Sequence, residues 1–265
     1  MVRRMSGPPP AAPRAVAATR YVTPLREGGS LPALVEADDD GLYVVKFRGA
    51  GQGPLALVAE MIVGGLARLL DLAVPEVVVV DLPQGLAGAE PDQEIQDLLR
   101  ASVGANVGLD FLPGALAFDP ASAAQVDPDR AAEIVWLDAL TTNVDRSARN
   151  PNLLLWHGRV WAIDHGAALY RHHVGWPIAP DAGKAFPAIA EHVLLPFAGS
   201  IEAADGRLAH RVGGAALAGI VAGVPDGWLA PAPGPVDRRA DYVEYLSSRL
   251  ASRGFVAEAE RARTA

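Results

Sequence analysis

The sequence predicts an α+β fold of two unequal lobes, a small β-rich N-lobe followed by a larger, mainly helical C-lobe. Its 265 residues, 50% of them apolar, are enough for one large domain or two tightly associated lobes with a sizeable core. The pattern changes near Pro113-Gly114, because β-prone runs dominate before it and helical spacing dominates from Asp127 onward. We therefore expect an N-lobe over 19–112 and a C-lobe over 113–265.

The first part of the chain is rich in Pro, Ala and Arg and shows no hydrophobic period, so we expect a disordered leader over 1–18. Beyond it, three short β-prone runs are separated by two turn signals, Gly-Gly-Ser and Asp-Asp-Asp-Gly. This pattern predicts an antiparallel meander with strands over 21–25, 31–37 and 42–47.

The rest of the predicted N-lobe alternates helices and strands. Apolar residues at helical spacing over 55–72 predict an amphipathic helix that ends before Pro75. A run of valines predicts a buried strand over 76–81, because β-branched side chains favour strands. A short helix over 91–100 and a last strand over 103–112 complete the lobe.

The predicted C-lobe opens with a helix at Asp127-Pro128, where proline occupies the favoured first turn. A polar loop over 141–152 follows, and then two strands flank the turn at His157-Gly158. The strands are expected over 153–156 and 160–163, and helices are expected at about 184–197, 207–222 and 237–262.

Composition excludes several classes of protein. A net charge of −8 and a pI of 5.2 argue against nucleic acid or an anionic membrane as partner, since both need a positive surface. No apolar stretch reaches the roughly 18 residues of a membrane span. The absence of cysteine excludes disulfides, thiolate metal sites and a thiol nucleophile, and is typical of a cytoplasmic protein.

Lysine is rare, with only Lys46 and Lys184 among 23 basic residues. Lys46 lies in a β-prone run, and Glu60 lies on the next predicted helix beside a stripe of small side chains. Protein kinases use a strand lysine paired with a helix glutamate to present a positive charge to ATP phosphates. Each residue also has an ordinary interpretation, as an edge-strand lysine that keeps the sheet soluble and as a solvated helix charge.

A second set of polar residues follows the first predicted C-lobe helix. Kinase catalysis needs a carboxylate near the acceptor hydroxyl, an asparagine five residues later as a metal ligand, and an Asp-x-Gly after the next hairpin. Asp145, Asn150 and Asp164-His165-Gly166 occupy these places. An Asx-rich turn and an ordinary Asp-Gly strand end would each explain half of the pattern. The order of all these residues along the chain favours the kinase interpretation.

The segments 143–154 and 162–167 resemble the catalytic and metal-binding segments of HipA-like kinases, a family related in fold to phosphoinositide kinases and more distantly to protein kinases. The resemblance extends over about 21–250 and is specific at these two segments. It implies a two-lobed protein-kinase-like fold, ATP and Mg²⁺ as cofactors, and phosphoryl transfer to a hydroxyl.

The resemblance also implies a role for individual residues. By position, Asp145 would be the catalytic aspartate, Asn150 and Asp164 the Mg²⁺ ligands, and Lys46 the phosphate-binding lysine. The chain departs from ordinary protein kinases in three places, since Asn-Val replaces the His-Arg before the catalytic aspartate, His165 replaces a phenylalanine, and no Ala-Pro-Glu is present. Activation-loop phosphorylation is therefore not supported.

Two further segments are expected to contact the nucleotide. The turn formed by Gly28, Gly29 and Ser30 could hold phosphates through backbone N–H groups, although Gly-Gly-Ser is equally a plain hairpin turn. A linker over 110–116 is expected to bind the adenine edge through its backbone, because ligands commonly bind where lobes meet. Its residues expected to contact the nucleotide are Asp110, Phe111 and Leu112.

The sequence thus predicts an ATP- and Mg²⁺-dependent kinase that acts on a hydroxyl of a protein or small molecule. A nucleotide-binding pseudokinase that lacks transfer activity is an alternative. The presence of the four residues to which the resemblance assigns roles favours activity; they are Lys46, Asp145, Asn150 and Asp164. A third class is a pyridoxal phosphate enzyme with Lys46 or Lys184 as the Schiff-base lysine. That class lacks a visible Gly/Ser phosphate-binding segment in this chain.

Overall fold

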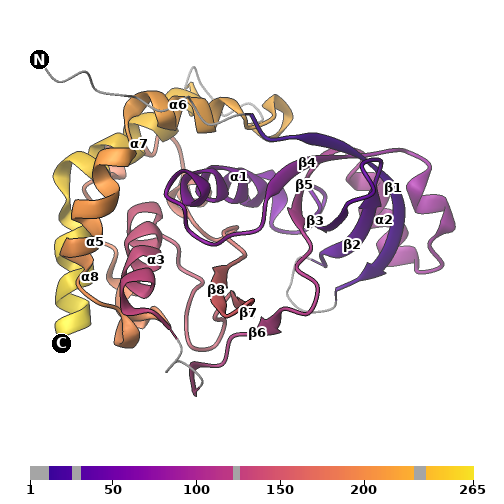
Figure 1. The fold of residues 1–265 in the computed structure, drawn as a ribbon. Helices are drawn as coiled ribbons and strands as arrows, with labels where there is room; N and C mark the ends of the chain where they lie inside the picture. Colours follow the sequence, from indigo (N-terminus) through magenta and orange to yellow (C-terminus); the bar gives the residue numbers. More distant parts are fainter. Residues whose placement is uncertain (1–11, 26–30, 122–125, 230–236) are drawn as a thin grey trace, which may run out of the picture.

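The computed structural model describes residues 12–25, 31–121, 126–229 and 237–265. Within these residues the α+β class is confirmed, with a β-rich N-terminal part and a helical C-terminal part (Figure 1). No described helix is long and apolar enough to cross a membrane.

The N-terminal part is built on a closed five-stranded barrel with the order β1-β2-β3-β5-β4. The expected meander is confirmed, because β2 pairs antiparallel with both β1 and β3. The barrel closes where β1 pairs parallel with β4. Its strands are β1 Ala15–Pro24, β2 Ala33–Ala37, β3 Leu42–Lys46, β4 Val77–Leu82 and β5 Gly104–Asp110.

The expected leader is too long, because β1 already begins at Ala15. Val16 and Ala18 are buried in the barrel, and Ala15 to Ala17 pair with β4. The small side chains that look featureless in the sequence suit a barrel interior, where little space is left. Residues 1–11 lie outside the described residues.

Two helices accompany the barrel strands, α1 Gly53–Leu69 and α2 Gln93–Ala101, close to the predicted 55–72 and 91–100. Figure 1 shows α1 between the barrel and the C-terminal helices. Buried residues of α1 belong to the large core cluster shared with those helices, whereas the barrel interior and α2 form a separate, smaller cluster. Helix α1 therefore joins the two parts of the molecule.

The C-terminal part begins as predicted. Helix α3 starts at Pro128, and the Asp127 side chain accepts hydrogen bonds from the backbone N–H groups of Asp129 and Arg130. The two predicted strands form the hairpin β7–β8, and a short strand joins them in a second sheet of order β6-β7-β8. The bounds are α3 Pro128–Thr141, β6 Leu116–Ala117, β7 Leu153–Trp156 and β8 Arg159–Ala162.

The remaining helical predictions are only partly right. The helix expected at about 184–197 is wrong. Two short 3-10 turns form instead, with Pro187 as the first residue of one and Pro196 as the second residue of the other. The helix expected over 207–222 is interrupted, because α5 ends at Leu208, a 3-10 turn follows over Ala209–Arg211, and α6 begins only at Gly214. The helix expected over 237–262 is divided at Arg253, whose φ is 53°. The observed helices are α4 Arg171–Val174, α5 Ile201–Leu208, α6 Gly214–Ala222, α7 Arg238–Ser252 and α8 Gly254–Thr264, with 3-10 turns at Leu86–Ala89, Ala179–Asp181, Pro187–Glu191, Leu195–Phe197, Ala209–Arg211 and Asp226–Trp228.

A buried arginine holds the end of α3, from which the polar loop leaves. Arg249 on α7 donates hydrogen bonds to the carbonyls of Leu140 and Ala139, both at 2.8 Å. These carbonyls belong to the last turn of α3, where backbone acceptors lack helical partners. The start of the loop over 143–150 is thereby held against α7.

Candidate functional site

Lys46 lies in the interior of the barrel sheet and not at an edge. Its strand β3 is paired on one side with β2 and on the other with β5, and the lysine is 8% exposed. The interpretation of Lys46 as an edge-strand lysine that keeps the sheet soluble is therefore wrong. The side chain instead forms ion pairs with Glu60 on α1 and with Asp164, whose Oδ1 lies 2.6 Å from Nζ.

Glu60 is fully buried, which rules out a solvated helix charge. The expected Lys46–Glu60 ion pair is present. Burial raises the pKa of Glu60 and the nearby Lys46 charge lowers it only in part, so the net shift is upward. For Lys46, burial acts to lower the pKa, but attraction to Glu60 and Asp164 outweighs it and raises the pKa above its usual value. The lysine therefore stays charged.

Asp164 follows β8 with a φ of 54°, a left-handed conformation that few non-glycine residues adopt. Burial opposes its ionisation, but the Lys46 charge outweighs burial and leaves the pKa of Asp164 below its ordinary value. Its Oδ1 contacts Lys46 and accepts a 3.4 Å hydrogen bond from the Gly166 N–H. Within the described residues Oδ2 accepts no hydrogen bond, so one carboxylate oxygen is free for a ligand.

Asp145 and Asn150 lie together in the loop after α3. Asn150 Nδ2 donates to Asp145 Oδ2 at 2.9 Å, and Asn152 Nδ2 donates to the backbone carbonyl of Asp145 at 2.6 Å. Asn143 Oδ1 accepts the Asp145 N–H at 3.1 Å. Three asparagines thus hold the aspartate, and Asp145 and Asn150 both remain at least partly exposed.

Sequence reasoning missed the residue that joins these two segments, Arg146, which is 2% exposed. Its Nε bonds to the buried Asp138 on α3, and its Nη1 donates to the carbonyls of Asn152 and Ile163. Its Nη2 donates to His165 Nδ1 at 3.1 Å. One guanidinium thus connects the loop of Asp145 with the segment of Asp164.

The carboxylate beneath this connection is Asp138, which also accepts a 2.9 Å hydrogen bond from His192 Nε2. Burial alone would raise its pKa, but the Arg146 charge and the His192 hydrogen bond hold the pKa of Asp138 well below its usual range. The sequence contains one sign of this group, an aspartate within the apolar run of α3, because a buried acid needs partners. The sequence does not indicate which residues those partners are.

His165, between Asp164 and Gly166, is buried and neutral. Burial and the Arg146 charge lower the pKa of His165 to about 3. Because an arginine can only donate, Nδ1 is the unprotonated ring nitrogen and the proton lies on Nε2. Nε2 is buried without a hydrogen-bond partner among the described residues.

The donor set suits a small hard cation. Asn150 and Asp164 both offer side-chain oxygens, the ligand type that Mg²⁺ prefers, and Asp145 adds a further carboxylate in the same loop as Asn150. The described residues contain no group of three or more His, Asp or Glu side chains that could hold a metal by themselves. Mg²⁺ is usually bound through one or two carboxylates together with substrate phosphates and water, so a complete protein cage is not required for it.

The other residues predicted to contact the nucleotide lie in the Gly-Gly-Ser turn and in the linker over 110–116. Gly28, Gly29 and Ser30 lie outside the described residues. Asp110 ends β5, and its N–H and that of Phe111 already donate to the carbonyls of Glu76 and Leu42, both at 2.9 Å. Both N–H groups are therefore unavailable to a ligand.

The fold and site together describe a chain in which a buried barrel lysine, a buried helix glutamate and the partly exposed Asp-His-Gly aspartate form one ion-pair group. A comparison with family models matches residues 19–176 to the HipA-like kinase family. The chain belongs to that family, and this membership indicates a kinase. No curated protein matched the chain significantly.

Proposed function

We propose that this protein is an ATP- and Mg²⁺-dependent kinase with a two-lobed kinase-like arrangement, which transfers the γ-phosphoryl group of ATP to a hydroxyl. The observation that carries the proposal is the position of Lys46 Nζ between Glu60 and Asp164. A lysine held between a helix carboxylate and the Asp-x-Gly carboxylate is arranged to contact ATP phosphates next to a bound metal.

Each residue then has a separate task. Lys46 holds the phosphates, and Glu60 fixes the lysine. Asn150 and Asp164 would hold Mg²⁺, which when bound offsets charge on the phosphates. Asp145 would orient the acceptor hydroxyl and accept its proton. Phosphoryl transfer needs mainly positioning and charge stabilisation, so these tasks suffice without a covalent intermediate on the protein.

The linker over 110–116 is proposed to bind the adenine edge. Asp110 pairs with Tyr43 on β3, three positions along the strand from Lys46, which is roughly 10 Å at 3.4 Å per residue. This spacing leaves room for a ribose between the linker and the phosphates. With the Asp110 and Phe111 N–H groups engaged, Leu112 offers the nearest backbone donor.

The two competing classes differ in their support. The pyridoxal phosphate alternative loses its main candidate, because Lys46 is charged and paired with two carboxylates, whereas a Schiff-base lysine must be neutral to attack. The pseudokinase alternative shares the site and differs only in whether phosphate is transferred.

The test compares Asp164→Asn with Asp145→Asn, and Asp97→Asn on the exposed face of α2 is the control. A ligand at 100 times its Kd stabilises the fold by about 2.7 kcal/mol, which raises the Tm of a chain of this size by about 5–10 °C. Asp164→Asn is expected to lose most of the Mg-ATP shift and the activity together. Asp145→Asn is expected to keep the shift and lose turnover, as when an interaction of the transition state is removed.

The outcomes separate the classes. If both variants bind Mg-ATP and transfer phosphate like the wild type, the assignment of the site is overturned. If the wild type shows the Mg-ATP shift but transfers phosphate to no acceptor, including water, the pseudokinase replaces the kinase.

A further inference from the structure

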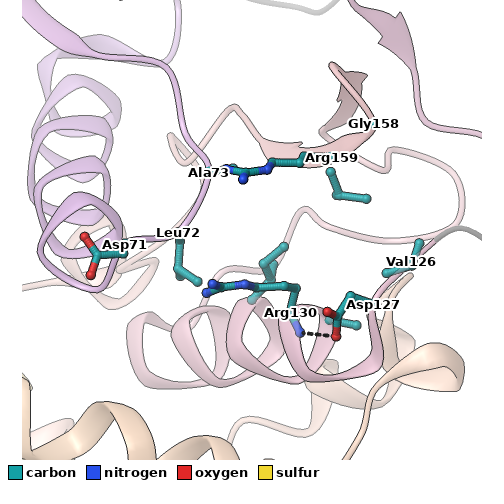
Figure 2. Close-up of a pocket in the computed structure, with 11 residues that line it drawn as sticks. Asp71, Leu72, Ala73, Val126, Asp127, Arg130, Gly158 and Arg159 are labelled. Atoms are coloured by element: carbon teal, nitrogen blue, oxygen red, sulfur yellow. Dashed lines mark hydrogen bonds between the residues drawn. The ribbon is translucent and has the colours of Figure 1, made fainter.

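A cavity of about 330 Å³ lies away from the residues of the kinase site, where three segments meet. The segments are residues 71–73 after α1, the start of α3 from Val126 to Ile134, and the β7–β8 turn at 158–160. Figure 2 shows the side chains of Arg130 and Arg159 extending into this space, with both guanidinium groups turned toward the wall formed by Leu72 and Ala73.

The charged residues that line this cavity differ in whether they already have a partner of opposite charge or a backbone partner. Asp127 caps α3, and Asp71 pairs with Arg211 at 2.6 Å outside the cavity lining. Arg130 pairs with Glu133 at 2.7 Å. Arg130 and Arg159 are both exposed, and Arg159 forms no ion pair with a carboxylate among the described residues. Two guanidinium groups therefore face the same wall, and one of them lacks a counter-charge.

The remaining lining is apolar and comes from Leu72, Val126, Ile134 and Val160. The volume is at the lower end of the roughly 300–1,000 Å³ typical of small-molecule sites. A planar guanidinium fork binds a phosphate through two parallel hydrogen bonds, and two forks suit a dianion better than a single carboxylate.

We propose that this cavity, defined by Arg130 and Arg159, is a second binding site of this protein and that it takes a small organic phosphate monoester. The two arginines bind the phosphate, and the apolar side chains contact a short organic body. The proposal does not depend on the kinase activity.

The cavity is also connected to strand β8, which leads to Asp164 of the proposed kinase site. Arg159 and Val160 begin β8, which ends at Ala162, two residues before Asp164. The Ala162 N–H donates to the Ala73 carbonyl at 2.9 Å, so one wall of the cavity is hydrogen-bonded to this strand.

The experiment titrates phenyl phosphate against the wild-type protein by calorimetry, with benzyl alcohol as the probe for the organic body alone. Saturable binding of phenyl phosphate and none of benzyl alcohol is expected. Arg159→Glu is expected to weaken binding at least tenfold, and Arg130→Ala is expected to weaken it as well. The matched control Arg100→Ala, an exposed arginine on α2, is expected to bind like the wild type.

A further arm keeps this site distinct from the nucleotide site. In Lys46→Ala the binding of phenyl phosphate is expected to persist, since Lys46 does not line the cavity. Binding that is lost in Lys46→Ala and kept in Arg159→Glu would place the phosphate at the nucleotide site and overturn the proposal. Absence of saturable binding to the wild type at millimolar phenyl phosphate would also overturn it, whatever the kinase assay shows.

Discussion

Lys46 forms ion pairs with Glu60 and Asp164 in a chain that contains one other lysine, Lys184. Arg and Lys differ physically, because an ammonium is a compact charge on a flexible stem and a guanidinium is a broad planar fork. The space between Glu60 and Asp164 holds a single Nζ that contacts one oxygen of each carboxylate. The other oxygen of Asp164 accepts no hydrogen bond within the described residues.

Replacing Lys46 by Ala is expected to weaken ATP binding at least tenfold, about 1.4 kcal/mol, and to change adenosine binding little, because the lost charge faces phosphates. Calorimetric titration with both ligands measures the difference. Lys184→Ala is the matched control, since Lys184 is exposed and pairs only with Asp181 within the described residues. Equal losses for ATP and adenosine would remove the phosphate-binding role of Lys46.

Arg146 is expected to determine stability through Asp138. Arg146→Ala removes the positive charge beside the buried Asp138 carboxylate. The carboxylate then keeps only its hydrogen bonds from Asn143 and His192. Removing one partner of a buried ion pair costs about 3–5 kcal/mol. Denaturant unfolding checks this against Arg149→Ala, an exposed arginine in the same loop that should stay within about 0.5 kcal/mol of the wild type. Equal stability of the two variants contradicts the prediction.

At the scale of elements, β5 passes close to β4 because it carries a glycine. A Cβ at Gly108 would lie 2.5 Å from Val80 Cγ2 and 2.9 Å from Val78 Cγ2, both buried in the barrel. No real Cβ tolerates such approaches, so the two valines would have to shift. The same strand ends at Asp110, where the linker over 110–116 begins.

Gly108→Ala is therefore expected to destabilise the protein by about 1–3 kcal/mol, the usual effect of overpacking a core. Gly51→Ala is the control, because nothing lies within 4 Å of a Cβ there and its φ is not in the left-handed range. Thermal unfolding of both variants measures the effect. If the Gly108→Ala protein is as stable as the Gly51→Ala protein, the prediction is wrong, because the neighbouring valines must then accommodate the added methyl group without cost.

At the scale of the whole molecule, two cores meet at the site. Lys46 belongs to the barrel, Glu60 to α1 in the large core, and Asp164 to the segment after β8. The ion-pair group therefore connects three elements of the fold. Lys46 and Glu60 are 14 positions apart in sequence, whereas Lys46 and Asp164 are 118 positions apart.

Buried histidines make the stability of the whole molecule depend on pH. Burial is the main cause that lowers the pKa of both His165 and His172 from 6.5 to about 3. Below pH 6.5 the unfolded chain therefore binds protons that the folded protein does not, and stability is lost as the pH falls toward 3. For His165 alone this amounts to roughly 2 kcal/mol between pH 6.5 and pH 5, at about 1.36 kcal/mol per pH unit.

The measurement is the free energy of unfolding in denaturant at pH 7 and pH 5. The protein is expected to be less stable at pH 5, and the double variant His165→Gln, His172→Gln is expected to lose part of that difference. A wild-type protein that is equally stable or more stable at pH 5 would contradict this account, because it would mean that the histidines are not held neutral.

Local pattern determined most of the elements. Helix α1, the β7–β8 hairpin and the meander followed from periodicity and turn residues, because these features depend on neighbours within about ten residues. The motif order was equally visible, so the ion pair of Lys46 with Glu60 was predicted and is present. The ion pair of Lys46 with Asp164 was not predicted and appears only in the structure. The helix boundaries after residue 184 failed where proline, paired glycines and one left-handed residue interrupted apolar runs.

Only the tertiary structure decided the rest. The barrel closes through the pairing of β1 with β4, whose residues are more than 60 positions apart, and nothing local in the first strand indicates that partner. Arg146, Asp138 and His192 form one group for the same reason. A sequence shows that a buried charge needs a counter-charge, but the fold alone decides which distant side chain supplies it, because that choice follows from how the elements pack.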